Sequence, residues 1–370
     1  MTSVAVLADQ LFAAVPGGIG TYVRELLPAL READPTLDLR VFHTRQDRAT
    51  PIADLDGLSR VELPRGIRSL YPSWNLMGRP ALPGSLAAAG VVHAPSPVAI
   101  PPAGPRQRLV VTVHDLAFRV YPSLFPPAWR TMYRTGLRRA ARHADAIVAI
   151  SRHTARDLAR HALVDPARIR VIPLAASLPE SAGDPEPVLE RLKVPRPYLL
   201  FVGTLEPRKN LVRLVRAYRR LAVRLPHALV LAGPAGWRSQ RLHREVSLGG
   251  PGRVVLTGQV SAGDLDALYR GAAAFCYPSL YEGFGLPVLE ALARGVPTVV
   301  ADSSSLPEVA GDAALRANPR SVRALAEALE RVITDRAEAD RLAEAGPERA
   351  SLFSWDQTAR MTIRVYEGRL

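Results

Sequence analysis

Cysteine is almost absent from this sequence, since Cys276 is the only one among 370 residues. A single cysteine excludes an intrachain disulfide and is typical of a protein from a reducing compartment. Because Cys276 lies in an apolar, strand-like run, we interpret it as a small core residue rather than a nucleophile. The fold must then depend on hydrophobic cores, and the chain is long enough for two ordinary domains.

Long hydrophobic runs are also missing. No stretch approaches the roughly 18 uncharged apolar residues of a membrane-spanning helix. The first residues lack the basic lead of a secretory signal, and Asp9 interrupts their apolar run. We therefore expect a cytoplasmic protein, with peripheral contact at the inner face of the membrane as an open alternative.

Lysine is scarce although the chain is basic. There are 48 Lys plus Arg against 35 acidic residues, a net charge of +13, and only Lys193 and Lys209 are lysines. A bias in genomic base composition explains much of the arginine excess, and an anionic membrane or substrate would also explain it. Aromatic residues make up only 6% and no nucleic-acid-binding module is visible, so we expect no nucleic acid partner. Lys209 stands out, because a compact ammonium is a common partner of phosphate.

Apolar strand-like runs alternate with helical segments along most of the chain. The predicted strands are residues 4–7, 39–42, 61–63, 91–93, 109–113, 146–150, 169–172, 198–202, 229–233, 254–260, 272–277 and 297–301. This alternation favours an α/β fold with parallel sheets covered on both faces, in which ligands lie beyond the carboxyl ends of the strands.

An acidic, proline-rich linker at residues 178–187 indicates a boundary between two domains. We expect an N-terminal Rossmann-like domain at residues 1–178 and a C-terminal one at residues 190–350. Residues 351–370 are predicted to form a terminal helix.

The most informative stretch is residues 281–290, between the strand at 272–277 and a helix predicted from 288 to 294. Glu282 and Glu290 are separated by seven residues, and Gly283 and Gly285 allow the backbone to approach a ligand closely. The start of a helix after a glycine-rich loop is a ready site for phosphate. Two acids on either side of such a site could bind a sugar and a ribose.

A second strand, loop and helix begin at residues 198–202. Arg208 and Lys209 lie in the loop, directly before a helix that starts near Leu211. Cations there oppose the helix dipole, and this misfit is expected where a phosphate accompanies them.

The first half carries weaker signals. Gly17 and Gly18 follow the strand at residues 4–7 and precede a helix, but the spacing does not fit the dinucleotide-binding fingerprint. His114 follows the strand at residues 109–113, at a predicted ligand-binding edge.

Residues 203–210 and 281–290, with its E-x7-E spacing, closely resemble the motifs of the retaining glycosyltransferases of family four. This resemblance extends over nearly the whole chain and is loosest in the first half. It implies the GT-B fold, in which the Rossmann-like domain at residues 1–178 binds the acceptor and the one at residues 190–350 binds the nucleotide sugar. The two domains would face a cleft, and the C-terminal helix would cross back to the first domain. The resemblance also implies hexosyl transfer from a nucleotide diphosphate sugar to a saccharide or lipid-linked acceptor, with retention of configuration and without a metal or other cofactor.

The resemblance also implies roles for particular residues. Glu282 would contact the sugar, Glu290 the ribose, and Arg208 with Lys209 the leaving diphosphate, while His114 would lie near the transferred sugar. Backbone groups would complete the donor site, and those we assign are Gly17, Gly18, Val260, Gly283, Phe284, Gly285 and Leu286. Four residues form the predicted catalytic set, namely His114, Arg208, Lys209 and Glu282.

One predicted helix has a basic face. Arg130, Arg134, Arg138 and Arg142 recur every fourth residue in the helix predicted from about residue 128 to residue 143. We hypothesise that this face meets an anionic membrane or a lipid-linked acceptor, and a solvated face is the alternative.

Other chemistries fit the sequence less well than glycosyl transfer. A metal-dependent transferase would need Asp-x-Asp after a strand, and residues 54–56 and 264–266 fit only the letters. A glycoside hydrolase needs two carboxylates but no Arg-Lys phosphate loop. The remaining alternatives are a nucleotide-sugar epimerase of similar fold and a non-catalytic nucleotide-sugar-binding protein. Residues 203–210 resemble the same loop of bacterial mannosyl and related hexosyl transferases of surface polysaccharides. This resemblance implies GDP-mannose as the first candidate donor and a UDP-hexose as the second.

Overall fold

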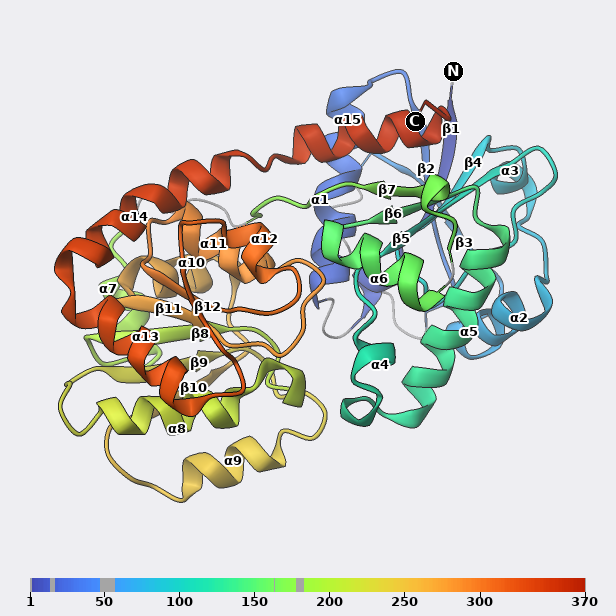
Figure 1. Cartoon of the computed structure of the whole chain (residues 1–370). Coiled ribbons are helices and arrows are strands. Elements are labelled where there is room, and N and C mark those ends of the chain that lie inside the picture. The colour runs from blue at the N-terminus through green and yellow to red at the C-terminus, as the bar shows by residue number, and fades with distance from the viewer. Residues whose placement is uncertain (1, 14–16, 47–56, 163, 178–182, 370) are drawn as a thin grey trace. The chain divides into compact units, whose positions relative to one another are not determined.

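The computed structural model describes residues 2–13, 17–46, 57–162, 164–177 and 183–369 (Figure 1). The chain divides into two units, one formed by Met1–Leu174 with Ser354–Leu370 and the other by Ala175–Phe353. Each unit is built on one parallel sheet with helices around it.

Seven strands form the sheet of the first unit within its described residues, in the order β3-β2-β1-β4-β5-β6-β7. Every pairing between neighbours is parallel. The strands are β1 (Ser3–Leu7), β2 (Asp38–His43), β3 (Ser59–Glu62), β4 (Val91–Ala94), β5 (Arg108–Val113), β6 (Ala146–Ala149) and β7 (Ile169–Val171). The central strands are apolar and buried on both faces, as the alternation of strand and helix predicts.

Helices connect these strands and bury one face against the sheet. They are α1 (Gly17–Ala33), α2 (Ile67–Met77), α3 (Gly84–Ala87), α4 (Ala117–Val120), α5 (Pro127–His143) and α6 (Arg152–Ala162). In α1, Val23, Leu26 and Leu30 are fully buried, which is the face that their spacing predicts.

The second unit has six strands in its described residues, in the order β10-β9-β8-β11-β12-β13, again all parallel. They are β8 (Tyr198–Val202), β9 (Ala228–Ala232), β10 (Val254–Gly258), β11 (Ala274–Tyr277), β12 (Thr298–Ala301) and β13 (Leu315–Ala317). Its helices are α7 (Glu186–Arg191), α8 (Leu211–Leu221), α9 (Gln240–Ser247), α10 (Ala262–Gly271), α11 (Leu286–Ala293), α12 (Leu306–Ala310), α13 (Val322–Thr334) and α14 (Arg336–Ser351). Cys276 is buried in β11, as predicted.

The last helix, α15 (Trp355–Tyr366), belongs to the first unit. It packs beside α1 (Figure 1), and the Thr358 hydroxyl donates to the Pro173 carbonyl at 2.7 Å. Tyr366 completes the docking, since its hydroxyl lies 2.7 Å from Nδ1 of His93 in β4. The prediction of a terminal helix that returns to the first domain is confirmed.

Candidate functional site

The loop after β8 is held in one conformation by its own backbone and by Asn210. Residues 207–209 form a short 3-10 turn, and Asn210 has a left-handed φ of 62°, a conformation that asparagine tolerates better than most residues. The Asn210 amide donates to the carbonyls of Pro278 and Pro319, at 3.0 and 2.7 Å. Asn210 therefore ties this loop to the one that follows β11, a role that sequence reasoning missed.

Arg208, Lys209 and Glu282 meet at the carboxyl edge of this sheet. The Lys209 ammonium donates to Glu282 Oε1 at 2.7 Å and lies 2.6 Å from the Tyr277 hydroxyl. The Arg208 guanidinium donates to Glu282 Oε2 at 2.7 Å and to Glu206 Oε1 at 2.9 Å. These four charged residues, Glu206, Arg208, Lys209 and Glu282, form what we call the ion cluster, and charge-assisted bonds of this kind fix its geometry.

Burial makes the ion cluster electrostatically strong. The side chains of Lys209 and Glu282 are only 9% and 8% exposed. Burial alone would raise the pKa of Glu282, but the adjacent Arg208 and Lys209 lower that pKa to about 2. Burial lowers the pKa of Lys209, and the Glu282 carboxylate opposes this shift. Glu282 is therefore a carboxylate over the whole physiological pH range, in a site of low dielectric constant.

The loop that carries Glu282 is fastened by three consecutive serines after β12. The Ser305 hydroxyl donates to the carbonyls of Glu282 and Phe284, both at 2.9 Å. The Glu282 N–H donates to Ser304 Oγ at 2.8 Å, and the Ser303 hydroxyl donates to the Leu280 carbonyl at 2.7 Å. We call residues 303–305 the serine clamp, because each of its side chains contacts the backbone of residues 280–284.

Gly285 directly precedes α11, and Glu290 lies on that helix. Gly285 has a φ of 118°, a conformation that favours glycine, and a Cβ there would lie 2.8 Å from Leu306 Cδ2, so the Leu306 side chain would have to shift. Glu290 Oε2 accepts a hydrogen bond from the buried Tyr269 hydroxyl at 2.9 Å. The helix begins at Leu286, two residues before the predicted start, because Pro287 fits its first turn.

The structure brings most of the predicted donor-site residues to one edge of the second sheet. Arg208 and Lys209 follow β8, residues 281–286 follow β11, and Val260 follows β10. Phe284 is buried against Phe353 with ring centroids 5.8 Å apart, so only the Phe284 backbone is available to a ligand. Parallel strands direct these segments to a shared edge, which is where ligands bind in such sheets.

Three predicted residues lie in the first unit. Gly17 and Gly18 are exposed at the start of α1, and Gly17 has a φ of 59°. His114 follows β5, with Nε2 lying 2.8 Å from the Pro95 carbonyl. A carbonyl oxygen only accepts, so Nε2 carries the proton and Nδ1 is an acceptor. Burial lowers the pKa of His114, which favours this neutral form.

Only one of the two Asp-x-Asp sequences, at residues 264–266, lies within the described residues. Asp264 and Asp266 lie on α10, where Asp264 pairs with Arg191 and the buried Asp266 pairs with Arg270 and Arg294. Both aspartates are therefore engaged in ion pairs, whereas residues 54–56 lie outside the described residues. The described part of the chain holds no group of three or more His, Cys, Asp or Glu that could bind a metal ion.

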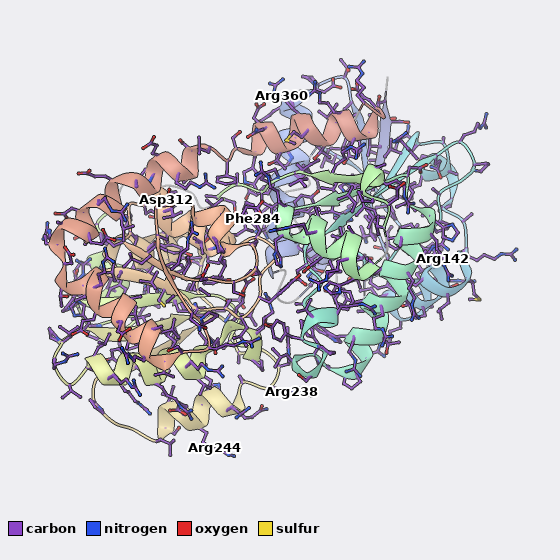
Figure 2. All side chains as sticks on the ribbon, viewed as in Figure 1. Arg142, Arg238, Arg244, Phe284, Asp312 and Arg360 are labelled. Atoms are coloured by element: carbon purple, nitrogen blue, oxygen red, sulfur yellow. The ribbon has the colours of Figure 1, made fainter. Side chains whose placement is uncertain are left out.

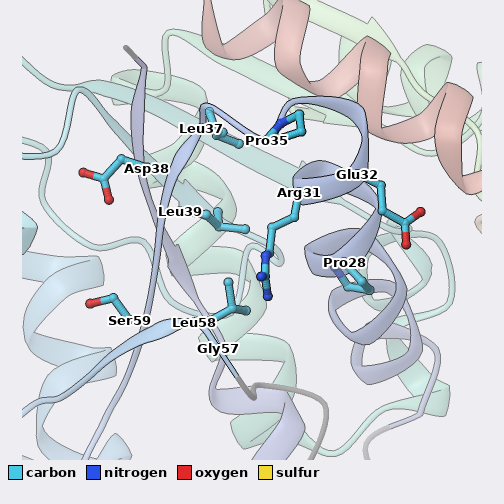
Figure 3. Close-up of a pocket in the computed structure, with 10 residues that line it drawn as sticks. All are labelled: Pro28, Arg31, Glu32, Pro35, Leu37, Asp38, Leu39, Gly57, Leu58 and Ser59. Atoms are coloured by element: carbon cyan, nitrogen blue, oxygen red, sulfur yellow. The ribbon is translucent and has the colours of Figure 1, made fainter.

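Described residues of the first unit line at least two cavities. The larger one, of about 620 Å³, is next to the amino ends of β2 and β3, and Figure 3 shows Arg31 extending from α1 toward Gly57 and Leu58 there. The smaller one, of about 320 Å³, lies beyond the carboxyl ends of β1 and β4. Ligands of parallel α/β sheets bind at carboxyl ends, so the smaller cavity is the better candidate for a binding site.

We find no helix, among those of the described residues, with the length and hydrophobicity that crossing a membrane requires.

Comparison with solved structures defines the class of fold. Sucrose-phosphate synthase from Thermosynechococcus elongatus superposes with a TM-score of 0.75 at 23% identity, covering 100% of this chain and 99% of that one. Anabaena HepE in complex with UDP and glucose gives the same TM-score at 18% identity, covering 100% of both chains. The chain has the GT-B fold.

Sequence comparison then gives the family. Residues 16–178 match the family described as Glycosyltransferase Family 4, and residues 188–349 match Glycosyl transferases group 1. The O-antigen chain mannosyltransferase B of Escherichia coli is 34% identical over 268 residues, which cover 70% of each protein. The serotype-specific mannosyltransferase WbdA of Escherichia coli is 30% identical over 283 residues, but the match spans only 34% of that protein. The chain therefore belongs to the group 1 and family 4 glycosyltransferases that these matches define.

Proposed function

We propose that the protein transfers mannose from GDP-mannose to a saccharide or lipid-linked acceptor, with retention of configuration and without a metal ion. The ion cluster is the observation that carries this proposal. Its two cations lie beside the Glu282 carboxylate, whose pKa they lower to about 2, at the edge where a nucleotide diphosphate sugar would bind. The mannosyltransferase relatives favour mannose, and the UDP and glucose bound to HepE make a UDP-hexose the second candidate.

In this mechanism the charge that grows on the leaving diphosphate is stabilised by Arg208 and Lys209. Preorganised cations in a buried site need no reorganisation as the bond breaks, which is where electrostatic catalysis is strongest. Retention of configuration without a covalent intermediate requires that the nucleoside diphosphate leaves, and the acceptor hydroxyl attacks, on the same face of the sugar. The leaving phosphate then helps to deprotonate the acceptor hydroxyl.

Other residues of the second unit supply the remaining contacts to the donor in this proposal. Glu282 accepts hydrogen bonds from sugar hydroxyls, and backbone N–H groups of residues 283–286 complete that subsite. Glu290 binds the ribose hydroxyls, with Tyr269 orienting the carboxylate at 2.9 Å. Backbone at Val260 borders the base.

The first unit contributes other groups to the proposed reaction. The proposed role of Gly17 and Gly18, which the family resemblance implies, is to donate backbone N–H groups to the donor phosphates, because the start of a helix favours anions. The proposed role of His114 is to accept a hydroxyl hydrogen bond of the transferred sugar at Nδ1, in the tautomer described above.

Incubation of the purified protein with labelled GDP-mannose or UDP-glucose, with and without a mannoside acceptor, tests the proposal. We expect a new mannoside that forms only with GDP-mannose and acceptor, that survives a chelator and that has the α configuration of the donor by NMR. A β product would refute retention, and loss of activity with the chelator would refute metal independence. An epimerised nucleotide sugar formed without acceptor would favour the epimerase alternative.

We also propose that the protein is cytoplasmic and that its first unit contacts anionic lipid at the inner face of the membrane. Of the four arginines predicted on one face of α5, Arg130 is half-buried, whereas Arg134, Arg138 and Arg142 are exposed. Arg142 extends away from the helix (Figure 2). The neighbouring α2 exposes Leu76 and Met77, which are 69% and 67% accessible. Basic side chains around apolar ones are typical of surfaces that bind anionic lipid.

Co-sedimentation with anionic vesicles tests this contact. Changing Arg134, Arg138 and Arg142 together to Glu should abolish sedimentation with these vesicles. Unchanged sedimentation of the triple variant would contradict the proposal, as would equal binding to neutral vesicles.

A further inference from the structure

Tyr277 lies beside the ion cluster, and the proposed reaction leaves it without a role. It is the last residue of β11 and is 1% exposed. Its hydroxyl oxygen lies 2.6 Å from the ammonium nitrogen of Lys209. An ammonium has only donors, so the Tyr277 oxygen accepts this hydrogen bond. The contact therefore favours the charged form of Lys209.

Stacked aromatic rings hold Tyr277 in this position. Its ring is stacked with that of Phe201 in β8, at 5.6 Å between centroids and 13° between planes, and with that of Phe275 in β11, at 5.9 Å and 18°. These two strands are the central pair of the six-stranded sheet. Such ring pairs are favourable, so the hydroxyl is directed at Lys209 by a ring that the core of the second unit fixes.

The surroundings of Lys209 disfavour an ammonium in two ways. Burial lowers the pKa of Lys209, and the Arg208 guanidinium acts in the same direction, whereas the Glu282 and Glu206 carboxylates oppose this shift. Glu282 is shared, because its Oε1 accepts from Lys209 while its Oε2 accepts from Arg208. The ion cluster thus holds two cations and two carboxylates, and it has no excess negative charge to keep Lys209 protonated.

Tyr277 supports the cation without adding a charge. Burial, together with the Glu282 carboxylate, raises the pKa of Tyr277 well above its ordinary value, so the phenol stays neutral. The Lys209 nitrogen also lies 4.9 Å from the centroid of the Tyr277 ring, within the range of a cation–π interaction. A neutral acceptor holds the ammonium but does not cancel the positive charge that a diphosphate would meet.

We propose that Tyr277 is a positioning residue, whose hydroxyl fixes the Lys209 ammonium and keeps it protonated for the diphosphate of the nucleotide sugar. The inference rests on the proposed function, since it concerns a cation that would stabilise the leaving group. Tyr277 acts through Lys209 and does not itself contact the sugar or the phosphates. Without its hydroxyl, Lys209 loses its proton at a lower pH, and binding of the nucleotide sugar fails at a lower pH with it.

NMR of protein labelled with ¹³C at lysine Cε tests the effect on Lys209 directly, because the chain has only two lysines and the other, Lys193, is exposed. We expect the Lys209 signal to titrate at a lower pH in Tyr277→Phe than in wild type, and at a still lower pH in Tyr277→Leu, which also removes the ring. Tyr198→Phe is the matched control, since Tyr198 is a buried strand residue of the same unit whose hydroxyl donates to the Leu268 carbonyl at 2.7 Å. The control should titrate as wild type does. Equal titration of Lys209 in wild type and Tyr277→Phe would overturn the proposal.

The pH dependence of nucleotide binding and of transfer tests the positioning role. Stabilisation by GDP should disappear at a lower pH in Tyr277→Phe than in wild type and Tyr198→Phe. The alkaline limb of kcat/KM for the nucleotide sugar should move in the same direction. At neutral pH we expect kcat/KM to fall about tenfold, as for the loss of one hydrogen bond to a charged group. A merely structural residue would lower the stability of Tyr277→Phe and leave both pH profiles in place, which would contradict the inference.

The outcomes separate this inference from the proposed function. If GDP stabilises wild type and Tyr277→Phe with the same pH dependence, Tyr277 has no positioning role and the assignment of the nucleotide site stands. If no nucleoside diphosphate stabilises wild type at any pH, the proposed function fails, and the role of Tyr277 in the reaction fails with it.

Discussion

Lys209 is the residue whose chemical type matters most in the candidate site. Its ammonium lies 2.6 Å from the Tyr277 hydroxyl and 2.7 Å from Glu282, in a buried space that suits a compact donor. A guanidinium is larger and planar, so an arginine there would be overpacked and would donate in other directions. This accounts for a lysine at one of only two positions in an arginine-rich chain.

We expect Lys209→Ala and Lys209→Arg to lower kcat/KM for the donor sugar by about 10²–10³-fold, the usual effect of removing one preorganised donor. Lys193, the other lysine, is exposed, so Lys193→Ala and Lys193→Arg are matched controls that should retain activity. Full activity of Lys209→Arg would show that compactness is irrelevant. Full activity of Lys209→Ala would remove the residue from the site.

At the scale of single residues, the sequence predicts which residues lie in the candidate site better than it predicts which of them contact each other. Arg208, Lys209 and Glu282 follow buried strands, and parallel strands bring such residues to one edge. Their pairing with each other and with Glu206 depends on the path of two loops, which side-chain pattern alone does not encode.

The serine clamp shows how one element positions another. Ser305 is fully buried and its hydroxyl donates to two carbonyls of the loop that carries Glu282. Three consecutive serines in the sequence indicate only a polar turn. Their contacts depend on the adjacent placement of β11 and β12, a feature of sheet topology.

Ser305→Ala should lower the free energy of unfolding by about 1–3 kcal/mol, because it leaves buried carbonyls without a donor. It should also raise the KM for the donor, since the Glu282 loop loses its support. Urea denaturation and steady-state kinetics measure the two effects. Ser351→Ala, at an exposed hydroxyl that donates to the Glu348 carbonyl, is the control. If Ser305→Ala behaves like Ser351→Ala in both measurements, the clamp has no positioning role.

The docking of α15 depends on a buried histidine. His93 Nε2 lies 2.9 Å from Thr112 Oγ1, and Nδ1 lies 2.7 Å from the Tyr366 hydroxyl. Burial, with a smaller effect of His114, lowers the pKa of His93 to about 3, whereas an unfolded histidine titrates near 6.5. Between these values the unfolded chain binds more protons, so the His93 contribution to stability is complete above the unfolded pKa and is lost as pH falls.

We expect this group to remove ~2 kcal/mol of unfolding free energy between about pH 7.5 and about pH 5. His93→Gln should abolish that part of the pH dependence, while His243→Gln, at an exposed histidine, should keep it. Urea denaturation of the three proteins at both pH values measures the difference. Equal pH slopes in wild type and His93→Gln would contradict the assignment.

At the scale of the whole molecule, the alternation of strands and helices is sufficient to predict two parallel-sheet units. The predicted strands differ from the observed ones by a residue or two, apart from the short β13, whose three residues have no apolar run. The order of the strands in each sheet is harder to predict from the sequence, because it depends on which face of the sheet each connecting helix packs against. The cavity at the β1–β4 reversal follows from that order and could not be located from the sequence.

Net charge acts on the whole molecule but is unevenly distributed within it. The chain carries a net charge of +13, yet the ion cluster is balanced and the cavity beside β1 and β4 has no Lys or Arg among its described lining residues. The arginine excess is therefore located elsewhere, and the exposed face of α5 is one such region. Charge by itself indicates solubility and association, whereas function depends on the particular sites.

The measurement that tests the central claim most directly is thermal stabilisation by nucleotides. A ligand that binds only the folded state adds about 2.7 kcal/mol of stability at a hundredfold excess over its Kd, and Tm rises accordingly. The ion cluster predicts that GDP and GDP-mannose raise the Tm of wild type and of Lys193→Ala but not of Lys209→Ala. An equal rise in all three proteins, or no rise with any nucleoside diphosphate, would contradict a diphosphate site at Arg208 and Lys209.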